Sequence, residues 1–471
     1  MRHAILILAH KDLTDLRRLA MYFAKDCDVY IHIDKKLKGV QNEVQALERL
    51  PMVKYVSRRH NVNWGGFNML LAELELLGKS CQHGGYGYYH LLSGTDYPLK
   101  PLWYFLDFFS DATPTNYVRC QPMLMEHFQD RLLHFHPYDF LRCRERAHHI
   151  SKRLSRLQDK LGISRSIGDL PRHMYIGSQW FSITDEAVKS LLQEVRASNK
   201  FLMRMKYTFA PEEMFVNTMV MNGGGKVIPD NLRYIRWTNE NGNCPANLDL
   251  SHLKYCLASG ALFARKIDGQ VGKNLKSFLE QNIVSLPFGV MPTNNMRQWA
   301  DAFFDYDATV AEMVRNVAGI LGVSSVLYPE CGSCLYLDAL IGMKVPVLGI
   351  SSSELSEKLA KAFSLDEFFQ LAGINEVIEC GEPFDMTLFI NVSQLCKNND
   401  MSLLVGNIDK LTGKYVVLIE RKVSVDSHGE RNAIIGSLGD AGFDRLAYLG
   451  EACEVGYGLS YDVEILARRT P

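Results

Sequence analysis

Residues 4–34 read AILILAHKDLTDLRRLAMYFAKDCDVYIHID, and this stretch decides the fold of the first half of the chain. Residues 4–9 are a continuous apolar run, which is typical of a strand buried on both faces. Apolar residues then recur at helical spacing from Leu13 to Phe23. Residues 29–34 alternate between apolar and polar side chains, which is the period of a strand. The stretch therefore predicts the β-α-β unit of a parallel sheet.

The same pattern continues toward the carboxyl end. Leu70 to Leu77 have helical spacing and Tyr88 to Leu92 form another apolar run, so the opening predicts β-α-β-α-β. A new alternation of strand-like and helix-like segments begins at Ser325. The strands expected there cover residues 326–328, 345–350, 386–392, 415–419, 445–449 and 463–467. Both halves of the chain therefore predict an α/β fold.

The length of 471 residues also favours two domains. We expect a first domain over residues 1–285, a connection over 286–320 that includes Met291 to Asn295, and a second Rossmann-like α/β domain over 321–471. The hydrophobic fraction of 47% and the charged fraction of 22% are those of a globular protein.

Charge and cysteine usage exclude several classes of protein. The net charge of −1 carries no signature of nucleic-acid binding. The apolar run from Ala4 to Ala9 is too short for a signal peptide or a membrane span. The cysteines include one CxxC pair, Cys331 and Cys334, without a second pair that would complete a zinc site. We interpret the cysteines as reduced thiols and expect a cytoplasmic protein.

Two aspartates follow predicted strands of the first domain. Asp34 ends the second strand, and Asp96 follows the third in residues 90–101, HLLSGTDYPLKP. Ligands of open α/β sheets bind at the carboxyl ends of strands, where a carboxylate can accept hydrogen bonds from a uracil or a ribose. The alternative is a structural role in turns, since residues 94–98 have ordinary turn chemistry.

A pair of glutamates lies at a predicted helix start. Pro211, Glu212 and Glu213 suit a first helical turn, where carboxylates complement the helix dipole. A carboxylate fixed in this way is also well placed to act as a general base. Such a base removes the proton from an acceptor hydroxyl during glycosyl transfer with inversion.

Three cations are candidates for binding an anionic leaving group. Arg233, Arg265 and Lys266 lie at strand-like edges, and a departing nucleoside diphosphate needs its charge neutralised. An ordinary surface position is the alternative for the Arg-Lys pair. Two Asp-x-Asp triplets, at 26–28 and 305–307, are poorly placed to hold a metal ion, because one precedes a strand and the other lies in the connection.

Six short segments together resemble the Core-2/I-branching enzymes, which include β-1,6-N-acetylglucosaminyltransferases and peptide xylosyltransferases. They occur in the family's order over roughly residues 1–270: IHIDKK at 31–36, WGG at 64–66, HLLSGTDYPL at 90–99, GSQWF at 177–181, PEEMF at 211–215 and FARK at 263–266. The resemblance implies a GT-A-like fold, inversion at the anomeric carbon and no metal requirement.

The resemblance also assigns roles to individual residues. Glu213 takes the place of the catalytic base, and Glu212 the variable position before it. Arg233 and Lys266 match the family's phosphate-binding cations, with Arg265 as a helper. Asp34 and Asp96 match positions near the nucleotide. The donor expected first is UDP-N-acetylglucosamine, and UDP-xylose is the second choice.

Aromatic residues near these segments are candidates for contact with the acceptor. Trp180 and Trp237 offer flat apolar faces on which a sugar can stack, although a buried core role is equally open.

Residues 141–172 are strongly basic and contain a predicted amphipathic helix. Ile150, Leu154, Leu157 and Leu161 share one face of it, with basic residues around them. Such a helix either packs on its own domain or lies on the inner face of an anionic membrane. The missing anchor and disulfides suggest a bacterial cytosolic form that acts on a glycan or lipid-linked glycan acceptor.

The second domain resembles a class I methyltransferase fold. Glu330 and Gly332 match the glycine-containing turn after the first strand, and Asp385 the start of a later strand. Cys334 replaces the second glycine of that turn, and Ser351 replaces the acidic residue that would hold the ribose of S-adenosylmethionine. A degenerate packing domain and a working methyltransferase both remain open.

These observations leave three readings of the whole chain. The first is a glycosyltransferase. The second is an S-adenosylmethionine-dependent methyltransferase whose first domain binds a glycan, or a bifunctional enzyme. The third is a non-catalytic scaffold.

Overall fold

The structure is a computed structural model, in which the chain divides into two compact units. It describes residues 1–11, 13–23, 26–110, 113–141, 144–239, 244–286, 300–301, 303–343, 345–374, 383–392, 396, 400–421, 428–449 and 461–469. The first unit contains Met1–Ser251 and Ala261–Ser285, and the second contains His252–Gly260 and Leu286–Pro471. The predicted connection around Met291 to Asn295 lies outside the described residues.

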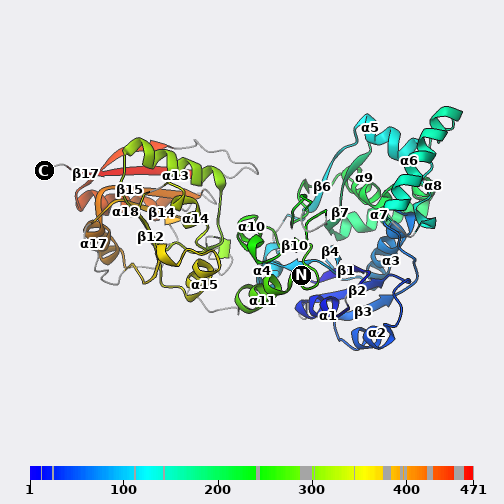
Figure 1. Cartoon of the computed structure of the whole chain (residues 1–471), viewed down its shortest axis with the longest axis horizontal. Coiled ribbons are helices and arrows are strands. Elements are labelled where there is room, and N and C mark those ends of the chain that lie inside the picture. Colours follow the sequence, from blue (N-terminus) through cyan, green and yellow to red (C-terminus); the bar gives the residue numbers. More distant parts are fainter. Residues whose placement is uncertain are drawn as a thin grey trace. The chain divides into compact units, whose positions relative to one another are not determined.

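A seven-stranded sheet forms the centre of the first unit (Figure 1). Its strands, in spatial order, are β3 (Val53–Ser57), β2 (Cys27–Ile33), β1 (His3–Ala9), β4 (Tyr88–Ser93), β7 (Tyr175–Thr184), β6 (Asn116–Pro122) and β8 (Val227–Ile228). The four strands from β3 to β4 are parallel, whereas β7 runs antiparallel to both of its neighbours. The carboxyl ends of β1, β2 and β4 therefore meet at one edge.

A smaller sheet and a set of helices complete the first unit. The small sheet has the order β5 (Tyr97–Pro98), β10 (Phe263–Arg265) and β9 (Arg233–Ile235). The helices are α1 (Leu13–Tyr22), α2 (Gln41–Glu48), α3 (Phe67–His83), α4 (Leu102–Phe108), α5 (Met125–Phe128), α6 (Arg144–Leu161), α7 (Asp185–Ala197), α8 (Lys200–Met205), α9 (Phe215–Asn222) and α11 (Lys273–Leu279). Apolar residues of α3, α7 and α9 share a buried core with the central strands.

The helices and strands predicted for the start of the chain are confirmed, but the structure contains two more elements than predicted. β1, α1, β2, α3 and β4 lie where the apolar pattern placed them. The structure inserts α2 and β3 between β2 and α3, which the prediction missed. β3 is an edge strand of five residues and its exposed positions interrupt the apolar run, so its signal is weak.

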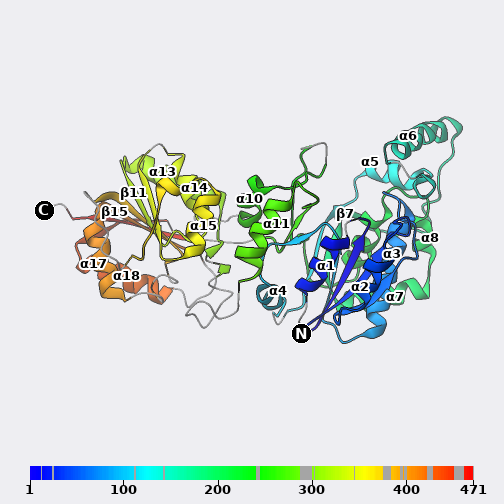
Figure 2. The same cartoon turned by 60° about the horizontal axis from the view of Figure 1, so that its bottom comes forward.

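The second unit has its own seven-stranded sheet with helices on both faces (Figure 2). Its strands, in spatial order, are β13 (Phe369–Leu371), β12 (Val347–Ser351), β11 (Val326–Pro329), β14 (Phe384–Ile390), β15 (Thr412–Arg421), β17 (Tyr461–Arg468) and β16 (Phe443–Leu449). The strands from β13 to β15 are parallel, and β17 is antiparallel to β15 and β16. This is a doubly wound α/β sheet with a hairpin at one edge.

Alternating side chains of this sheet supply two separate cores. Val417 and Ile419 pack with α13 (Ala308–Leu321) and α14 (Leu335–Ile341). Val416 and Leu418, one residue out of step, pack with α17 (Met401–Leu411) and α18 (His428–Asp440). The period of two along the strand therefore covers both faces. In the described part of this unit the structure also contains α10 (Leu253–Ala258) and α15 (Glu354–Ala362).

Every strand predicted in the second half has a counterpart, and two elements were missed. β13 is three residues long and carries no clear alternation. Residues 308–320, expected within the connection, belong to α13, which ends at Leu321. Asp307 caps its first turn through hydrogen bonds from Thr309 and Val310. The described part of the chain contains no helix that is long and apolar enough to cross a bilayer.

Candidate functional site

A cavity of about 1080 Å³ opens at the carboxyl edge of the first sheet. Residues that follow three neighbouring strands line it, namely His10 after β1, Asp34 after β2 and Thr95 after β4. The small sheet contributes Arg265 and Lys266 from the end of β10, and the segment after α8 contributes Glu212 and Glu213. The cavity therefore gathers most of the predicted site residues from distant parts of the sequence.

Asp34 is a buried carboxylate held in a fixed orientation. Its Oδ1 accepts hydrogen bonds from the backbone N–H of Lys36 at 3.0 Å and of Val62 at 3.2 Å. The Lys36 ammonium lies 3.3 Å from Oδ2. Asp34 therefore has the local hydrogen bonds of a turn residue, and it also lines the cavity.

Asp96 lies beneath the cavity wall and joins the two candidate arginines. Its carboxylate accepts from the Arg265 guanidinium at 3.0 Å, and Arg233 Nε lies 3.6 Å away. Neither Asp96 nor Arg233 exposes its side chain. Arg233 also donates to the carbonyls of Leu91 and Asn231, and burial lowers its pKa to about 10.

The structure therefore does not place Arg233 or Asp96 among the residues that line the cavity. Both were predicted to contact the donor directly. In this conformation Asp96 and Arg233 lie behind the residues that line the cavity. Of the two candidate arginines, Arg265 is the one that lines it.

Arg265 is held from a second side by Trp180. The guanidinium carbon lies 4.1 Å from the centroid of the indole ring, a cation–π distance. Trp180 is also buried and belongs to the apolar core, so of the two roles left open for it the buried one agrees with the structure. Trp237, by contrast, is 65% exposed and lines the cavity, so its ring is open to a ligand.

Glu213 is fixed at the cavity by an arginine that the sequence did not single out. Arg131 Nη1 lies 2.6 Å from Glu213 Oε2. Arg131 belongs to a π-helical turn, η1 (Gln129–Leu133), and its guanidinium also lies over the ring of Phe209. Glu213 ends a 3-10 turn, η3 (Pro211–Glu213), as the proline predicted, and its side chain keeps 37% of its surface exposed. A carboxylate so placed can reach a hydroxyl group in the cavity.

A second, buried pair of carboxyl groups lies beside Glu213. Glu212 and Glu73 are both buried, and burial is the main cause that raises the pKa of each, to about 8 for Glu212. The negative charge of Glu213 raises the pKa of Glu212 further. Glu73 lies on the buried, apolar face of α3. Its position in the helix gave no sign that it would lie next to the glutamates after Pro211.

Two histidines at the cavity are neutral by burial. Burial lowers the pKa of His32 to about 4, and its Nε2 accepts from the backbone N–H of His60 at 3.1 Å. Burial is also the main cause that lowers the pKa of His10. His10 directly follows β1, so its position after an apolar run could have identified it. His32 lies within β2, one residue before its end, and no such signal marks it.

The acidic triplets have structural partners. Asp28 accepts a hydrogen bond from the Tyr86 hydroxyl at 2.7 Å and pairs with Arg2. Asp307 caps α13. Asp28 is buried within β2 and Asp307 precedes α13, so both carboxylates have structural contacts.

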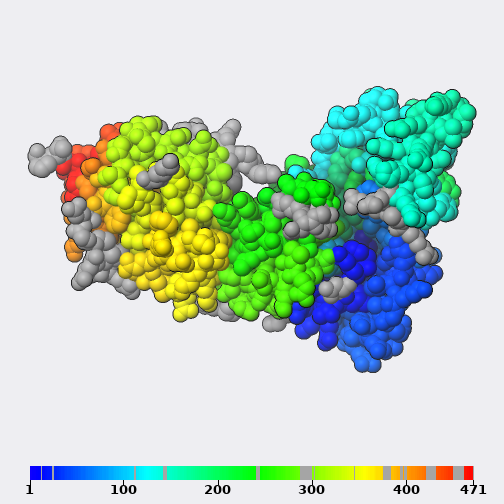
Figure 3. All heavy atoms as spheres, in the orientation of Figure 1, coloured from blue at the N-terminus to red at the C-terminus, as the bar shows by residue number. Residues whose placement is uncertain are grey.

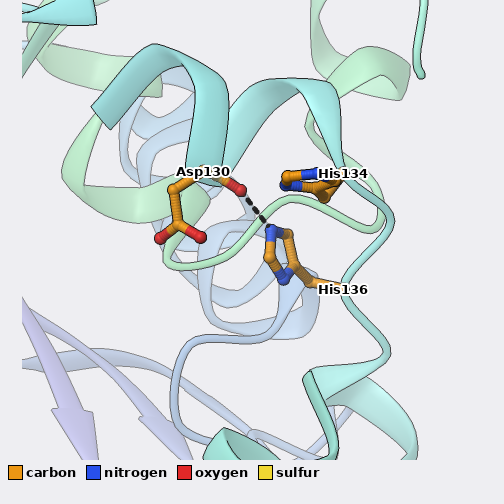
Figure 4. A group of neighbouring side chains, drawn as sticks. All are labelled: Asp130, His134 and His136. Atoms are coloured by element: carbon orange, nitrogen blue, oxygen red, sulfur yellow. Dashed lines mark hydrogen bonds between the residues drawn. The ribbon is translucent and has the colours of Figure 1, made fainter. Parts of the chain in front are cut away.

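One group in the described residues has the side chains of a metal site, Asp130, His134 and His136 (Figure 4). His136 already uses both ring nitrogens, with Ser151 Oγ at 2.6 Å and the Asp130 carbonyl at 2.7 Å. None of the three lines the cavity. We interpret the group as structural, because its hydrogen bonds connect η1 and the residues after it to α6.

In the second unit the glycine-containing turn follows β11, whose neighbours β12 and β14 lie on either side of it. Ligands of doubly wound sheets bind at such a position. Glu330, Gly332 and Cys334 all adopt positive φ there, and Ser333 N–H donates to the Phe303 carbonyl at 3.0 Å. Cys331 and Cys334 are free thiols with sulfur atoms 3.9 Å apart.

Asp385 does not join this turn. It lies at the amino end of β14 and accepts hydrogen bonds from Ser324, which precedes β11. Because β11 and β14 are parallel, Asp385 and Glu330 occupy opposite ends of the sheet. Its predicted place in an S-adenosylmethionine site has no support in the geometry.

Comparison with solved structures gives distant likenesses to methyltransferases. An N-methyltransferase from Bradyrhizobium japonicum shares 13% identity over 35% of this chain and 99% of its own, with a TM-score of 0.28. The magnesium protoporphyrin IX methyltransferase from Synechocystis shares 15% identity over 39% of this chain and 88% of its own, also with a TM-score of 0.28. No curated protein sequence matches the chain.

The family comparison concerns the unit that holds the cavity. The model of the Core-2/I-branching enzyme matches residues 4–257, more than half of the chain. The matched range includes Asp34, Asp96, Trp180 and Glu213, and it ends before Arg265 and Lys266. The chain therefore belongs to the Core-2/I-branching enzymes, a family of glycosyltransferases.

Proposed function

We propose that the chain transfers a sugar from a UDP-sugar to a hydroxyl group of a glycan acceptor, with inversion at the anomeric carbon and without a metal ion at the diphosphate. The observation that carries this proposal is the placement of a carboxylate and two cations in one cavity. Glu213 lies on one segment of the wall, and Arg265 and Lys266 lie on another.

In the proposed reaction Glu213 accepts the proton of the acceptor hydroxyl as its oxygen attacks the anomeric carbon. The bond from that carbon to the diphosphate breaks on the opposite side, which inverts the configuration. Arg265 and Lys266 stabilise the negative charge that develops on the leaving diphosphate. Asp34 is proposed to orient the nucleoside, since it lines the cavity at the carboxyl end of β2.

The donor proposed first is UDP-N-acetylglucosamine, with UDP-xylose as the alternative, and Trp237 is the proposed stacking surface for the acceptor. The acceptor class is a glycan or lipid-linked glycan of bacterial surface-polysaccharide synthesis, made in the cytoplasm. The choice of donor rests on the family resemblance, and Trp237 is proposed because its exposed ring lines the cavity.

The test measures UDP release from candidate donors in the presence of EDTA. We expect turnover to persist, and Glu213→Gln to lower it by roughly 10²–10⁴-fold while UDP binding is retained. Glu212→Gln is the matched control, because a neutral carboxyl group and an amide are similar in shape. Loss of turnover in EDTA, or full turnover in Glu213→Gln, would contradict the proposal.

A second candidate function is methyl transfer by the second unit, which would make the chain bifunctional. The glycine-containing turn at the centre of a doubly wound sheet favours it. Ser351 weighs against it, because its hydroxyl faces Ser356 Oγ at 3.1 Å where a carboxylate would hold a ribose. Calorimetry with S-adenosylmethionine separates the two: binding heat supports methyl transfer, and its absence supports a packing domain.

A further inference from the structure

Helix α6 is attached to the first unit in an unusual way. Its buried positions are occupied by Ala147, Ser151, Ser155 and Gln158. Amphipathic helices normally bury their apolar stripe and expose their polar face. Here the small and polar residues face inward.

The contacts that fasten α6 are polar. The Gln158 amide exchanges hydrogen bonds with the backbone N–H and carbonyl of Phe135, at 2.7 and 3.2 Å. His136 Nδ1 lies 2.6 Å from Ser151 Oγ, and His134 Nε2 lies 2.7 Å from Asp159 Oδ1. The helix is thus bound to the segment that directly follows η1 and its Arg131.

As a result most of the apolar stripe of α6 is left in solvent, while its fourth member, Leu154, is half-buried. Ile150 is 39% exposed, Leu157 is 50% exposed and Leu161 is 63% exposed. The helix lies at the periphery of its unit in both cartoon views (Figures 1 and 2) and stands out from the surface in the space-filling view (Figure 3). An exposed apolar stripe of this kind indicates an interaction surface.

Basic residues follow the same stripe. Arg146, Arg153 and Lys160 are exposed and recur every seven residues, so they form a row next to the apolar one. Residues 144–161 contain six Lys or Arg and two Asp or Glu. A partner for this surface must therefore offer negative charge together with an apolar layer that aliphatic side chains can enter.

We propose that α6 is a membrane-docking helix, which inserts Ile150, Leu157 and Leu161 into the surface of an anionic bilayer while Arg146, Arg153 and Lys160 bind lipid phosphates. An interfacial helix has this combination of a basic row and an aliphatic row. A second copy of the chain fits less well, because a symmetric contact would bring like charges together. Nucleic acid offers the charge but buries no aliphatic stripe.

This surface deepens the proposed function and rests on it in one respect. If the acceptor is lipid-linked, α6 brings it to the cavity, since the segment that fastens α6 follows the turn carrying Arg131, the partner of Glu213. Docking itself requires no sugar transfer. It is measured without any sugar nucleotide, so its failure and the failure of the glycosyltransferase assignment are distinguishable.

The experiment measures co-sedimentation of the full chain with phosphatidylcholine vesicles, with and without phosphatidylglycerol. We expect binding that requires the anionic lipid and weakens as salt rises. Arg153→Glu combined with Lys160→Glu should weaken binding by roughly fivefold or more per residue. Leu157→Asn combined with Leu161→Asn should weaken it by at least about tenfold.

Matched controls come from other helices. Arg196→Glu changes an exposed arginine of α7, and Ile320→Asn changes an exposed isoleucine of α13. Both should bind vesicles as the unchanged chain does. An unchanged melting temperature and an unchanged circular dichroism spectrum show that the α6 variants fold.

Three results would overturn the proposal. One is no binding to anionic vesicles, and another is equal binding by the α6 variants. The third combines two observations: light scattering shows a dimer that the Leu157→Asn/Leu161→Asn variant no longer forms, and the unchanged chain does not bind vesicles. That result would assign the apolar stripe to contact with a second copy of the chain.

Discussion

The guanidinium of Arg265 lies 4.1 Å from the centre of the Trp180 ring, and the same guanidinium donates to Asp96 at 3.0 Å. Trp180 and Asp96, which were each expected to touch a ligand, instead hold Arg265, one of the cations that line the cavity. A charge fixed before the diphosphate arrives needs little reorganisation when the leaving group departs.

Replacing Trp180 should therefore act on the donor. A cation–π contact of this kind contributes on the order of 0.5–2 kcal/mol. We expect Trp180→Leu to weaken UDP binding by roughly 3–30-fold, and Trp180→Phe, which keeps an aromatic face, to weaken it less. Titration calorimetry with UDP measures both. Equal affinities in the two variants would show that the ring does not hold Arg265.

Asp96→Asn should affect both stability and donor binding. The substitution leaves the buried Arg233 guanidinium without its carboxylate, and breaking a buried pair costs about 3–5 kcal/mol. It also releases Arg265. We expect a lower free energy of unfolding in urea together with weaker UDP binding. Asp230→Asn is the control, because Asp230 accepts a local hydrogen bond from Leu232 N–H and its charge acts on Arg233 less strongly than that of Asp96 does.

Arg131 is expected to be a positioning residue. It contacts Glu213 at 2.6 Å, and it is not among the cations proposed to bind the diphosphate. Arg131→Gln should lower kcat by about tenfold or more, because the base loses its fixed orientation, while the KM for the donor changes little. Steady-state kinetics separate the two constants. A large rise in donor KM with unchanged kcat would place Arg131 at the diphosphate instead.

Glu212 should make stability depend on pH. Its carboxyl group ionises near 4.5 in the unfolded chain and near 8 in the folded chain. Between these values the folded state binds more protons, so the free energy of unfolding falls as pH rises. In Glu212→Gln the fall in the free energy of unfolding with pH should be smaller, by on the order of a few kcal/mol. Urea unfolding at about pH 5 and about pH 8 measures it. An unchanged pH dependence in the variant would assign the effect to another group, of which Glu73 is the first to test.

The candidate site shows which kinds of residue a sequence can identify. Asp34 and Glu213 were found because each follows an element with a strong local signal, an alternating strand or a proline at a helical turn. Arg131 was missed because its partner Glu213 lies 82 residues away in the sequence. Glu73 was missed because it lies among the buried residues of α3. Neither position carries a local pattern that indicates chemistry.

The sequence by itself determined the two α/β units, the strand ends that Asp34 and Asp96 follow, and the glutamate pair after Pro211. These features depend on periodicity and turn chemistry, which act over a few residues. Only the tertiary structure decided that Arg265 rather than Arg233 lines the cavity, that Asp385 lies at the far end of its sheet, and that α6 buries its polar side. Each of these outcomes depends on which side chains meet across the fold, and burial and ion pairing there are set by residues far away in the chain.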